Sequence, residues 1–196
     1  MSMAKEKVVI CVAGLTACGK STAARRLAKK YGLEYVSGGT ALKELALEVG
    51  YQPKGNGWWE TNEGIRFIEE RLRDQQFDKK LDSQLLELAE RGNVVLDSWT
   101  MPWLSKKGFK IWLEVSPRER AKRLASRNGI RVEEAKRFIH AKDEKTKTIY
   151  ETLYGFRLGE DYSPFDLILN SETLTSNDVF EVLNLVIDRL VLQRRR

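Results

Sequence analysis

One stretch near the start of the chain decides the fold: Val8-Val9-Ile10-Cys11-Val12-Ala13-Gly14-Leu15-Thr16-Ala17-Cys18-Gly19-Lys20-Ser21. Residues 8–13 are apolar and rich in β-branched side chains, which is typical of a strand buried on both faces of a parallel sheet. Residues 14–21 form a glycine-rich loop, and residues 21–31 have the apolar spacing of a helix that ends at Gly32. A strand, a tight loop and a helix in this order predict an α/β fold.

The glycine-rich loop has the spacing of a phosphate-binding P-loop. Gly14 and Gly19 can adopt backbone conformations that a side chain would hinder, so the amides between them can curve around an anion. In this pattern Lys20 reaches the β- and γ-phosphates, Ser21 ligates Mg²⁺, and the following helix presents its positive end. A purely structural glycine turn is the alternative. We predict that ATP and Mg²⁺ bind to Gly14, Leu15, Thr16, Ala17, Cys18, Gly19, Lys20, Ser21 and Thr22.

Outward from this stretch, apolar runs and helical periodicity alternate along the chain. Further strands are predicted at residues 33–36, 94–97, 109–115 and 165–170. Helices are predicted at 40–49, 61–76, 77–91, 117–127, 131–153 and from 177 onward. This alternation predicts a single domain, residues 1–196, with a three-layer α/β architecture in which helices flank a mainly parallel sheet of about five strands.

The composition limits the kinds of molecule that the protein is expected to bind. The chain of 196 residues carries a net charge of +6, which suits phosphorylated small molecules or nucleic acid. The terminal Arg194–Arg196 are interpreted first as a solvated helix end and only second as a nucleic-acid contact. Cys11 and Cys18 suggest no disulfide framework, so we expect a cytoplasmic protein. No stretch reaches the roughly 20 apolar residues of a membrane span. We expect a monomer or small homo-oligomer without a membrane partner.

Asp97 is the next candidate for chemistry, because it ends the apolar strand predicted at residues 94–97. In P-loop enzymes a carboxylate at such a strand end lies near the metal ion. We therefore predict that Asp97 is catalytic and holds Mg²⁺ together with Ser21. The alternative is that Asp97 only caps the loop that follows.

Arg123 and Arg127 lie four positions apart on a predicted helix and so share one face. Arginine can stack on a flat base or form a bidentate contact with phosphate, which suggests that both bind the nucleotide cofactor. The alternative is a solvated face.

Lys142, Lys145 and Lys147 lie in the polar part of the helix predicted at 131–153. A basic segment can close over a transferring phosphate and supply positive charge, which makes Lys142 a candidate catalytic residue. The alternative is an exposed helix in which Asp143 and Glu144 are ion-pair partners of these lysines.

The remaining candidates for a functional role are the tryptophans, His140 and Cys18. Tryptophans near turns or strand ends can stack on a base, although core packing is their commoner role; these are Trp58, Trp59, Trp99 and Trp103. Trp112 lies within a strand and is expected in the core. His140 is expected on the surface, and Cys18 is interpreted as a small loop residue rather than an oxidation site.

Taken together, these features resemble the P-loop nucleoside monophosphate kinases, and most closely the archaeal cytidylate kinase family. The resemblance runs from about Val8 to Leu190. Besides the P-loop it rests on residues 35–39 and 43–46, 86–97, 111–113, 120–127, Tyr150, 154–155 and 165–170.

The resemblance implies a P-loop kinase fold with an acceptor-binding segment at about 37–91 and a lid at about 128–160. It implies transfer of the ATP γ-phosphoryl group to a nucleoside monophosphate, with CMP or dCMP as the default acceptor. It places Arg123 and Arg127 near the adenine and phosphates of the donor, and Lys142 where a lid arginine is expected. It suggests Ser37, Lys43 and Trp99 as acceptor-binding residues.

The chain departs from the family pattern on the acceptor side. The family usually has arginine at the position of Lys43, and an acid-Gly-Arg sequence where this chain has Asp97–Trp99. Arginines expected near Gln84, Lys142 and Ile149 are also absent. Loss of one such charge typically costs on the order of 10³ in rate. Two alternatives therefore stay open: a kinase for another nucleotide, a nucleic-acid end or a phosphorylated metabolite, and a non-catalytic ATP-binding relative.

Overall fold

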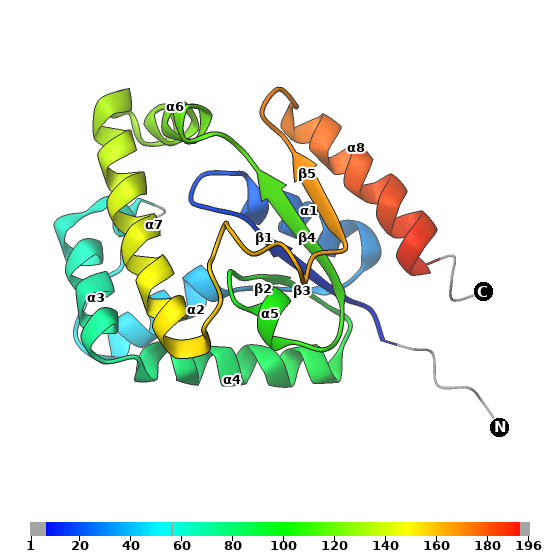
Figure 1. The fold of residues 1–196 in the computed structure, drawn as a ribbon, viewed down its shortest axis with the longest axis horizontal. Helices are drawn as coiled ribbons and strands as arrows, with labels where there is room; N and C mark the ends of the chain where they lie inside the picture. The colour runs from blue at the N-terminus through cyan, green and yellow to red at the C-terminus, as the bar shows by residue number, and fades with distance from the viewer. Residues whose placement is uncertain (1–6, 56, 193–196) are drawn as a thin grey trace.

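The computed structural model describes residues 7–55 and 57–192, and its centre is a five-stranded sheet (Figure 1). In spatial order the strands are β2 (Glu34–Ser37), β3 (Val94–Asp97), β1 (Val9–Ala13), β4 (Phe109–Glu114) and β5 (Leu167–Asn170). All neighbouring pairs run parallel. The predicted three-layer α/β fold with a mainly parallel sheet is therefore confirmed.

Helical segments connect the strands. Those within the described residues are α1 (Lys20–Tyr31), α2 (Gly38–Glu48), α3 (Asn62–Arg73), α4 (Gln76–Arg91), α5 (Met101–Leu104), α6 (Pro117–Asn128), α7 (Val132–Tyr154) and α8 (Ser176–Ile187), with a 3₁₀ turn η1 (Trp58–Glu60) and a π-helical turn η2 (Asp188–Leu192). None of the described helices has the length and apolarity that crossing a membrane requires.

Some boundaries differ from the sequence-based prediction. Helix α2 begins at Gly38 rather than at residue 40, because the Ser37 hydroxyl accepts a hydrogen bond from the Thr40 amide and caps the helix. The sequence pattern does not reveal α5, since one helical turn is too short to show a period. Strand β5 begins at Leu167 rather than at residue 165. The basic tail Arg194–Arg196 lies outside the described residues.

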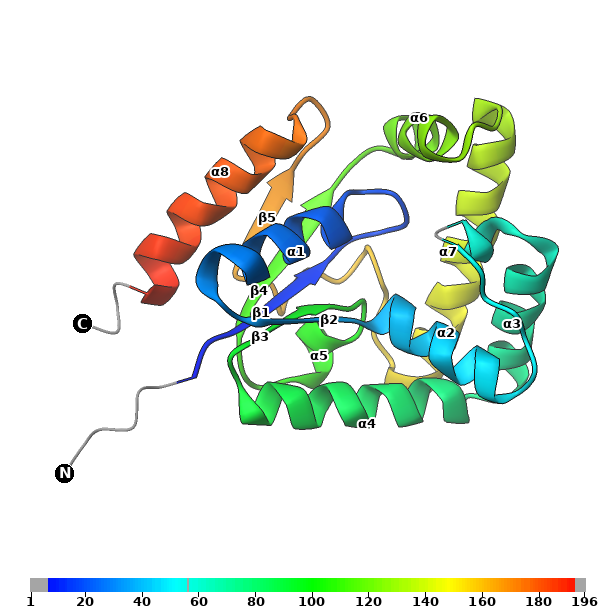
Figure 2. The same ribbon diagram turned by 180° about the vertical axis from the view of Figure 1, so that it is seen from behind.

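Helices cover both faces of the sheet (Figures 1 and 2). On one face, α1 and α8 pack against Ile10 and Val12 of β1. On the other face, α2, α3 and α4 pack against Val9 and Cys11. Successive side chains of a strand point to opposite faces, so a strand covered on both sides must be apolar throughout. This is why β1 appears in the sequence as an unbroken apolar run.

The carboxyl ends of the strands position the candidate site. Val12 of β1 lies beside Asp97 of β3, and Asp97 in turn lies beside Ser37 of β2. The loops that follow these three strands therefore meet at one edge of the sheet. The strand order reverses direction at β1, and ligands of open α/β sheets bind at the carboxyl ends beside such a reversal. Helix α7 packs against α6 and α3 and contributes to the same site.

Candidate active site

The P-loop connects β1 directly to α1 and depends on its first glycine. Gly14 has a φ of 146°, and a Cβ built there would lie 2.6 Å from both the Leu113 carbonyl oxygen and the Cys18 sulfur. A side chain at this position is therefore excluded by the neighbouring backbone. Gly19, with a φ of 99°, forms the N-cap of α1. The loop thus approaches the end of β4 closely before it enters the helix.

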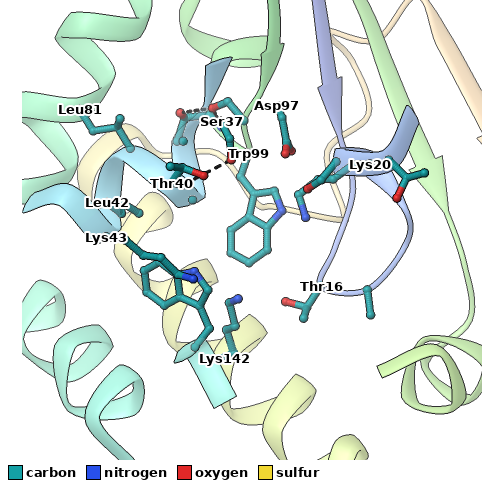
Figure 3. Close-up of a pocket in the computed structure, with 18 of the residues that line it drawn as sticks. Thr16, Lys20, Ser37, Thr40, Leu42, Lys43, Leu81, Asp97, Trp99 and Lys142 are labelled. Carbon is teal, nitrogen blue, oxygen red and sulfur yellow. Dashed lines mark hydrogen bonds between the residues drawn. The ribbon is translucent and has the colours of Figure 1, made fainter. Parts of the chain in front are cut away.

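A cavity of about 300 Å³ lies between the P-loop, α2, η1 and α7 (Figure 3). Most of the residues predicted for the site line this cavity: Thr16, Ala17, Lys20, Ser21, Thr22, Ser37, Lys43, Asp97, Trp99, Arg127 and Lys142. The other predicted residues, Gly14, Leu15, Cys18, Gly19 and Arg123, do not line it. The structure therefore joins most of the predicted donor and acceptor residues around one space.

Asp97 lies at the end of β3, where the sequence pattern expects a metal-binding carboxylate. Its Oδ2 atom accepts a hydrogen bond of 3.0 Å from the Tyr35 hydroxyl. Its Oδ1 atom is buried and has no hydrogen-bond partner among the described residues. Ser21 lines the same cavity. A carboxylate oxygen without a partner and a nearby hydroxyl are the oxygen ligands that Mg²⁺ prefers, so these two residues fit a metal ion.

Lys142 extends from α7 into the cavity between two tryptophans. Its Nζ lies 4.9 Å from the ring centroid of Trp59 and 5.9 Å from that of Trp99. The Nζ of Lys20 lies 5.2 Å from the centroid of Trp99, so both ammonium groups lie near the same indole. Burial lowers the pKa of Lys142 to about 8, although the nearby Glu60 carboxylate opposes the shift. Figure 3 shows both ammonium groups directed into the same space.

The tryptophans divide between the core and the cavity. Trp58 is 2% exposed and packs in the core, and Trp112 is fully buried as predicted. Trp103 stacks on Phe156 with their ring centroids 4.2 Å apart. Of the candidates for base stacking, only Trp59 and Trp99 line the cavity.

Helix α7 is attached to the P-loop by a buried cluster that the sequence does not reveal. Asp143 accepts hydrogen bonds of 2.6 Å from the Thr16 hydroxyl and 2.6 Å from Arg120 Nη1. Arg120 also donates to the Thr16 carbonyl oxygen at 3.1 Å. The alternative in which Asp143 pairs with neighbouring lysines is therefore wrong. In the tertiary structure Asp143 faces the protein interior, where it pairs with Arg120 of α6.

The two other lysines of this stretch form ion pairs. Lys145 pairs with Glu69 of α3 at 2.7 Å, and Lys147 pairs with Glu144 at 3.0 Å. Only Lys142 of the three lines the cavity. His140 is exposed, as predicted.

Arg71 is a cavity residue that the sequence analysis missed. It lines the cavity from α3 and forms a bidentate pair with Asp78 of α4, with Nη2–Oδ1 at 2.6 Å and Nε–Oδ2 at 3.0 Å. Both side chains are almost completely buried. A signal was available, because Arg71 follows Phe67 and Ile68 at helical spacing and so shares their buried face.

Arg123 and Arg127 contact different parts of the site although they share a helix face. Arg123 donates to the carbonyl oxygens of Cys18 at 3.3 Å and Ser171 at 2.7 Å. It lines a second hollow with the P-loop and residues 172–176. Arg127 pairs with Glu60 of η1 at 3.2 Å and lines the main cavity. A nucleotide contact from either arginine remains a prediction.

The fold is shared with solved small-molecule kinases. The crystal structure of shikimate kinase from Bacteroides thetaiotaomicron matches with a TM-score of 0.59 and 18% identity, covering 94% of this chain and 99% of that one. A gluconokinase from Sinorhizobium meliloti matches with a TM-score of 0.53 and 11% identity, covering 97% of each chain. At these identities the likeness concerns the fold alone, which is the P-loop kinase fold.

Sequence relatives define the family. The pattern of the cytidylate kinase-like family matches residues 9–173. The cytidylate kinase of Pyrococcus horikoshii is 33% identical over 189 residues, which cover 96% of this chain and 92% of that protein. The cytidylate kinase of Thermococcus kodakarensis is 34% identical with the same coverage. Because both matches extend over most of its length, the chain belongs to the cytidylate kinase-like family of nucleotide kinases.

Proposed function

We propose that this nucleotide kinase transfers the γ-phosphoryl group of ATP to a nucleoside monophosphate, with CMP or dCMP as the acceptor. The observation that carries the proposal is the shared cavity. It brings the P-loop residues Lys20 and Ser21 together with Ser37 and Lys43 of the acceptor-binding segment. The cytidylate kinases among the relatives support the choice of acceptor.

On the donor side, Lys20 stabilises the charge of the β- and γ-phosphates, and the P-loop amides hold their oxygens. Ser21 and Asp97 would hold Mg²⁺, which neutralises phosphate charge when it is bound. The adenine lies beside Arg123 in the second hollow. Residues 172–176, which follow β5, also line this hollow. The protein thus contributes mainly positioning and electrostatic stabilisation.

On the acceptor side, an oxygen of the acceptor phosphate forms a bond to the γ-phosphorus while the bond to the β–γ bridging oxygen breaks, and ADP leaves. Lys142 supplies positive charge where the negative charge of two phosphates converges. It lines the cavity and has no carboxylate hydrogen-bonded to its ammonium group in the described part of the chain. Lys43 is the second cation on this side, and its Nζ donates to the Gly55 carbonyl oxygen at 2.7 Å.

The test is a transfer assay with radiolabelled ATP and Mg²⁺ over CMP, dCMP, UMP, AMP and GMP. We expect labelled diphosphate product with CMP or dCMP above the other acceptors. Lys20→Ala is the control, because it removes the charge at the donor phosphates and should abolish transfer. Absence of transfer to every acceptor would contradict the proposal, and tight Mg·ATP binding without transfer would indicate a non-catalytic relative.

A further inference from the structure

Glu60, the last residue of η1, has a buried carboxylate oxygen without a partner. Its side chain is 7% exposed and lines the cavity. Oε1 accepts a hydrogen bond of 3.2 Å from Arg127, whereas Oε2 has no partner among the described residues. Burying an oxygen of a charged group without a hydrogen bond is costly. Lys43 and Lys142 are near enough to stabilise the carboxylate charge, but neither donates a hydrogen bond to Oε2 among the described residues, so this atom is available to a donor that arrives with a ligand.

The turn that carries Glu60 is held by core packing and hydrogen bonds. Trp58 packs among aromatic rings in the core, and its Nε1 donates to Glu63 at 2.6 Å. Gly64 allows α3 to approach closely, since a Cβ there would lie 2.2 Å from the Trp58 carbonyl oxygen. The Thr61 side chain caps α3 through the Gly64 amide. Glu60 thus reaches the cavity from a backbone that is packed and hydrogen-bonded on both sides of it.

Trp59, the preceding residue, offers a flat apolar surface beside the carboxylate. It lines the cavity, and Lys142 lies near its ring. A flat aromatic face next to a group that only accepts hydrogen bonds suits a heterocycle with an N–H donor on its edge. A phosphate is a poor partner for Glu60, because both groups are negative and neither has a proton to donate.

Resting on the proposed function, we propose that Glu60 selects the acceptor by its base: Oε2 accepts a hydrogen bond from an exocyclic amino group while the base stacks on Trp59. The substrate class is then a nucleotide with an amino-bearing base. A uracil or hypoxanthine presents a carbonyl oxygen in place of the amino group, so two acceptors face each other at that position, and the base would have to shift for its ring N–H to reach Oε2 instead. Such an unpaired contact lowers both binding and turnover.

The proposal is tested with matched acceptors on the wild type and on Glu60→Gln. CMP and UMP differ in the group at position 4 of the ring, and AMP and IMP differ in the corresponding group of the purine. In the wild type we expect kcat/KM for CMP to exceed that for UMP. The glutamine amide can donate to a carbonyl, so Glu60→Gln should reduce the CMP-to-UMP ratio by roughly 10- to 100-fold, the usual worth of a hydrogen bond to a charged group.

Arg127→Gln is the matched control, because it breaks the same ion pair and leaves Glu60 in place. It should change kcat/KM for CMP and UMP by the same factor. If Glu60→Gln also lowers both equally, Glu60 only fastens η1 to α6, and the proposal is wrong. If Glu60→Gln instead alters the ratio of CMP to dCMP, its partner is a sugar hydroxyl, and the proposal is equally wrong.

Measurements of nucleotide binding distinguish a failure of this inference from a failure of the proposed function. Because Trp59 and Trp99 line the cavity, quenching of tryptophan fluorescence can report the Kd of CMP and UMP without turnover. If the wild type transfers no phosphate but binds CMP more tightly than UMP, and Glu60→Gln loses this preference, only the proposed function is contradicted. Transfer to CMP with an unchanged acceptor ratio in Glu60→Gln would contradict the inference alone. Circular dichroism of each variant confirms that the fold is retained.

Discussion

The indole nitrogen of Trp99 donates a hydrogen bond of 2.6 Å to the carbonyl oxygen of Gly14, the first residue of the P-loop. Trp99 thereby connects the loop after β3 to the loop after β1. The same side chain thus supports the P-loop backbone and places its ring 5.2 Å from the Lys20 ammonium nitrogen.

Trp99→Phe should loosen the P-loop, because phenylalanine keeps an aromatic ring, although a smaller one, and lacks the N–H donor. We expect the free energy of unfolding to fall by about 1 kcal/mol and the Kd of Mg·ATP to rise. Trp103→Phe is the control, since it loses a comparable 2.9 Å hydrogen bond to Asp161 that does not touch the P-loop. Urea unfolding and nucleotide titration check this. An equal rise in Kd in both variants would show that the Gly14 contact is not responsible.

Activity should fall as the pH rises through about 8, because burial lowers the pKa of Lys142 to that value and only the ammonium form carries the charge. Lys142→Arg should keep its activity to higher pH, since arginine stays protonated. The measurement is kcat against pH from 6 to 10 for both proteins. Identical profiles would mean that another group sets the decline.

The lowered pKa of Lys142 also makes the stability of the fold depend on pH. The pKa of Lys142 is lower in the folded than in the unfolded chain, so the unfolded chain binds more protons between pH 8 and 10.5. This residue therefore destabilises the fold at neutral pH, and its cost is relieved as the pH rises through that window. Lys142→Met should raise the melting temperature at pH 7 more than at pH 10.

Asp143→Ala should be strongly destabilising, because it leaves the Arg120 guanidinium buried without its carboxylate partner. We expect a loss of roughly 3–5 kcal/mol in the free energy of unfolding, which is usual for one partner of a buried pair. The double variant Arg120→Met/Asp143→Leu should lose much less, since no uncompensated charge remains. Denaturant unfolding of the two proteins makes the comparison, and a double variant as unstable as the single one would refute the argument.

Asp82 should make stability depend on pH in the acidic range. Burial raises its pKa to about 6, and the hydrogen bonds from Thr100 and Tyr154 only partly oppose this. The raised pKa means that Asp82 stabilises the fold below about pH 4, and that this contribution is lost as the pH rises through 6. Asp82→Asn should therefore remove part of the difference in unfolding free energy between pH 4 and pH 7. An unchanged difference would show that other groups cause it.

The sequence predicted the strand, loop and helix of the P-loop because this information is local. A buried strand, two glycines with their spacing, Lys20 and Ser21 are contiguous in the chain, and backbone sterics determine how such a loop folds. Asp97 was singled out for the same reason, since it ends the apolar strand β3, and its metal-binding role stays a prediction. The order of strands and helices also follows from local periodicity, which is why the sheet was predicted and the single-turn helix α5 was not.

The rest of the cavity lining was decided by contacts between helices, which a local sequence pattern does not encode. Arg71 of α3 meets Asp78 of α4, Asp143 of α7 meets Thr16 of the P-loop and Arg120 of α6, and Glu60 of η1 pairs with Arg127 of α6. Which charges are paired, buried or left for a ligand depends on where the helices pack. The sequence by itself thus determined the fold and the position of the P-loop, whereas the tertiary structure decided which side chains line the cavity beside it.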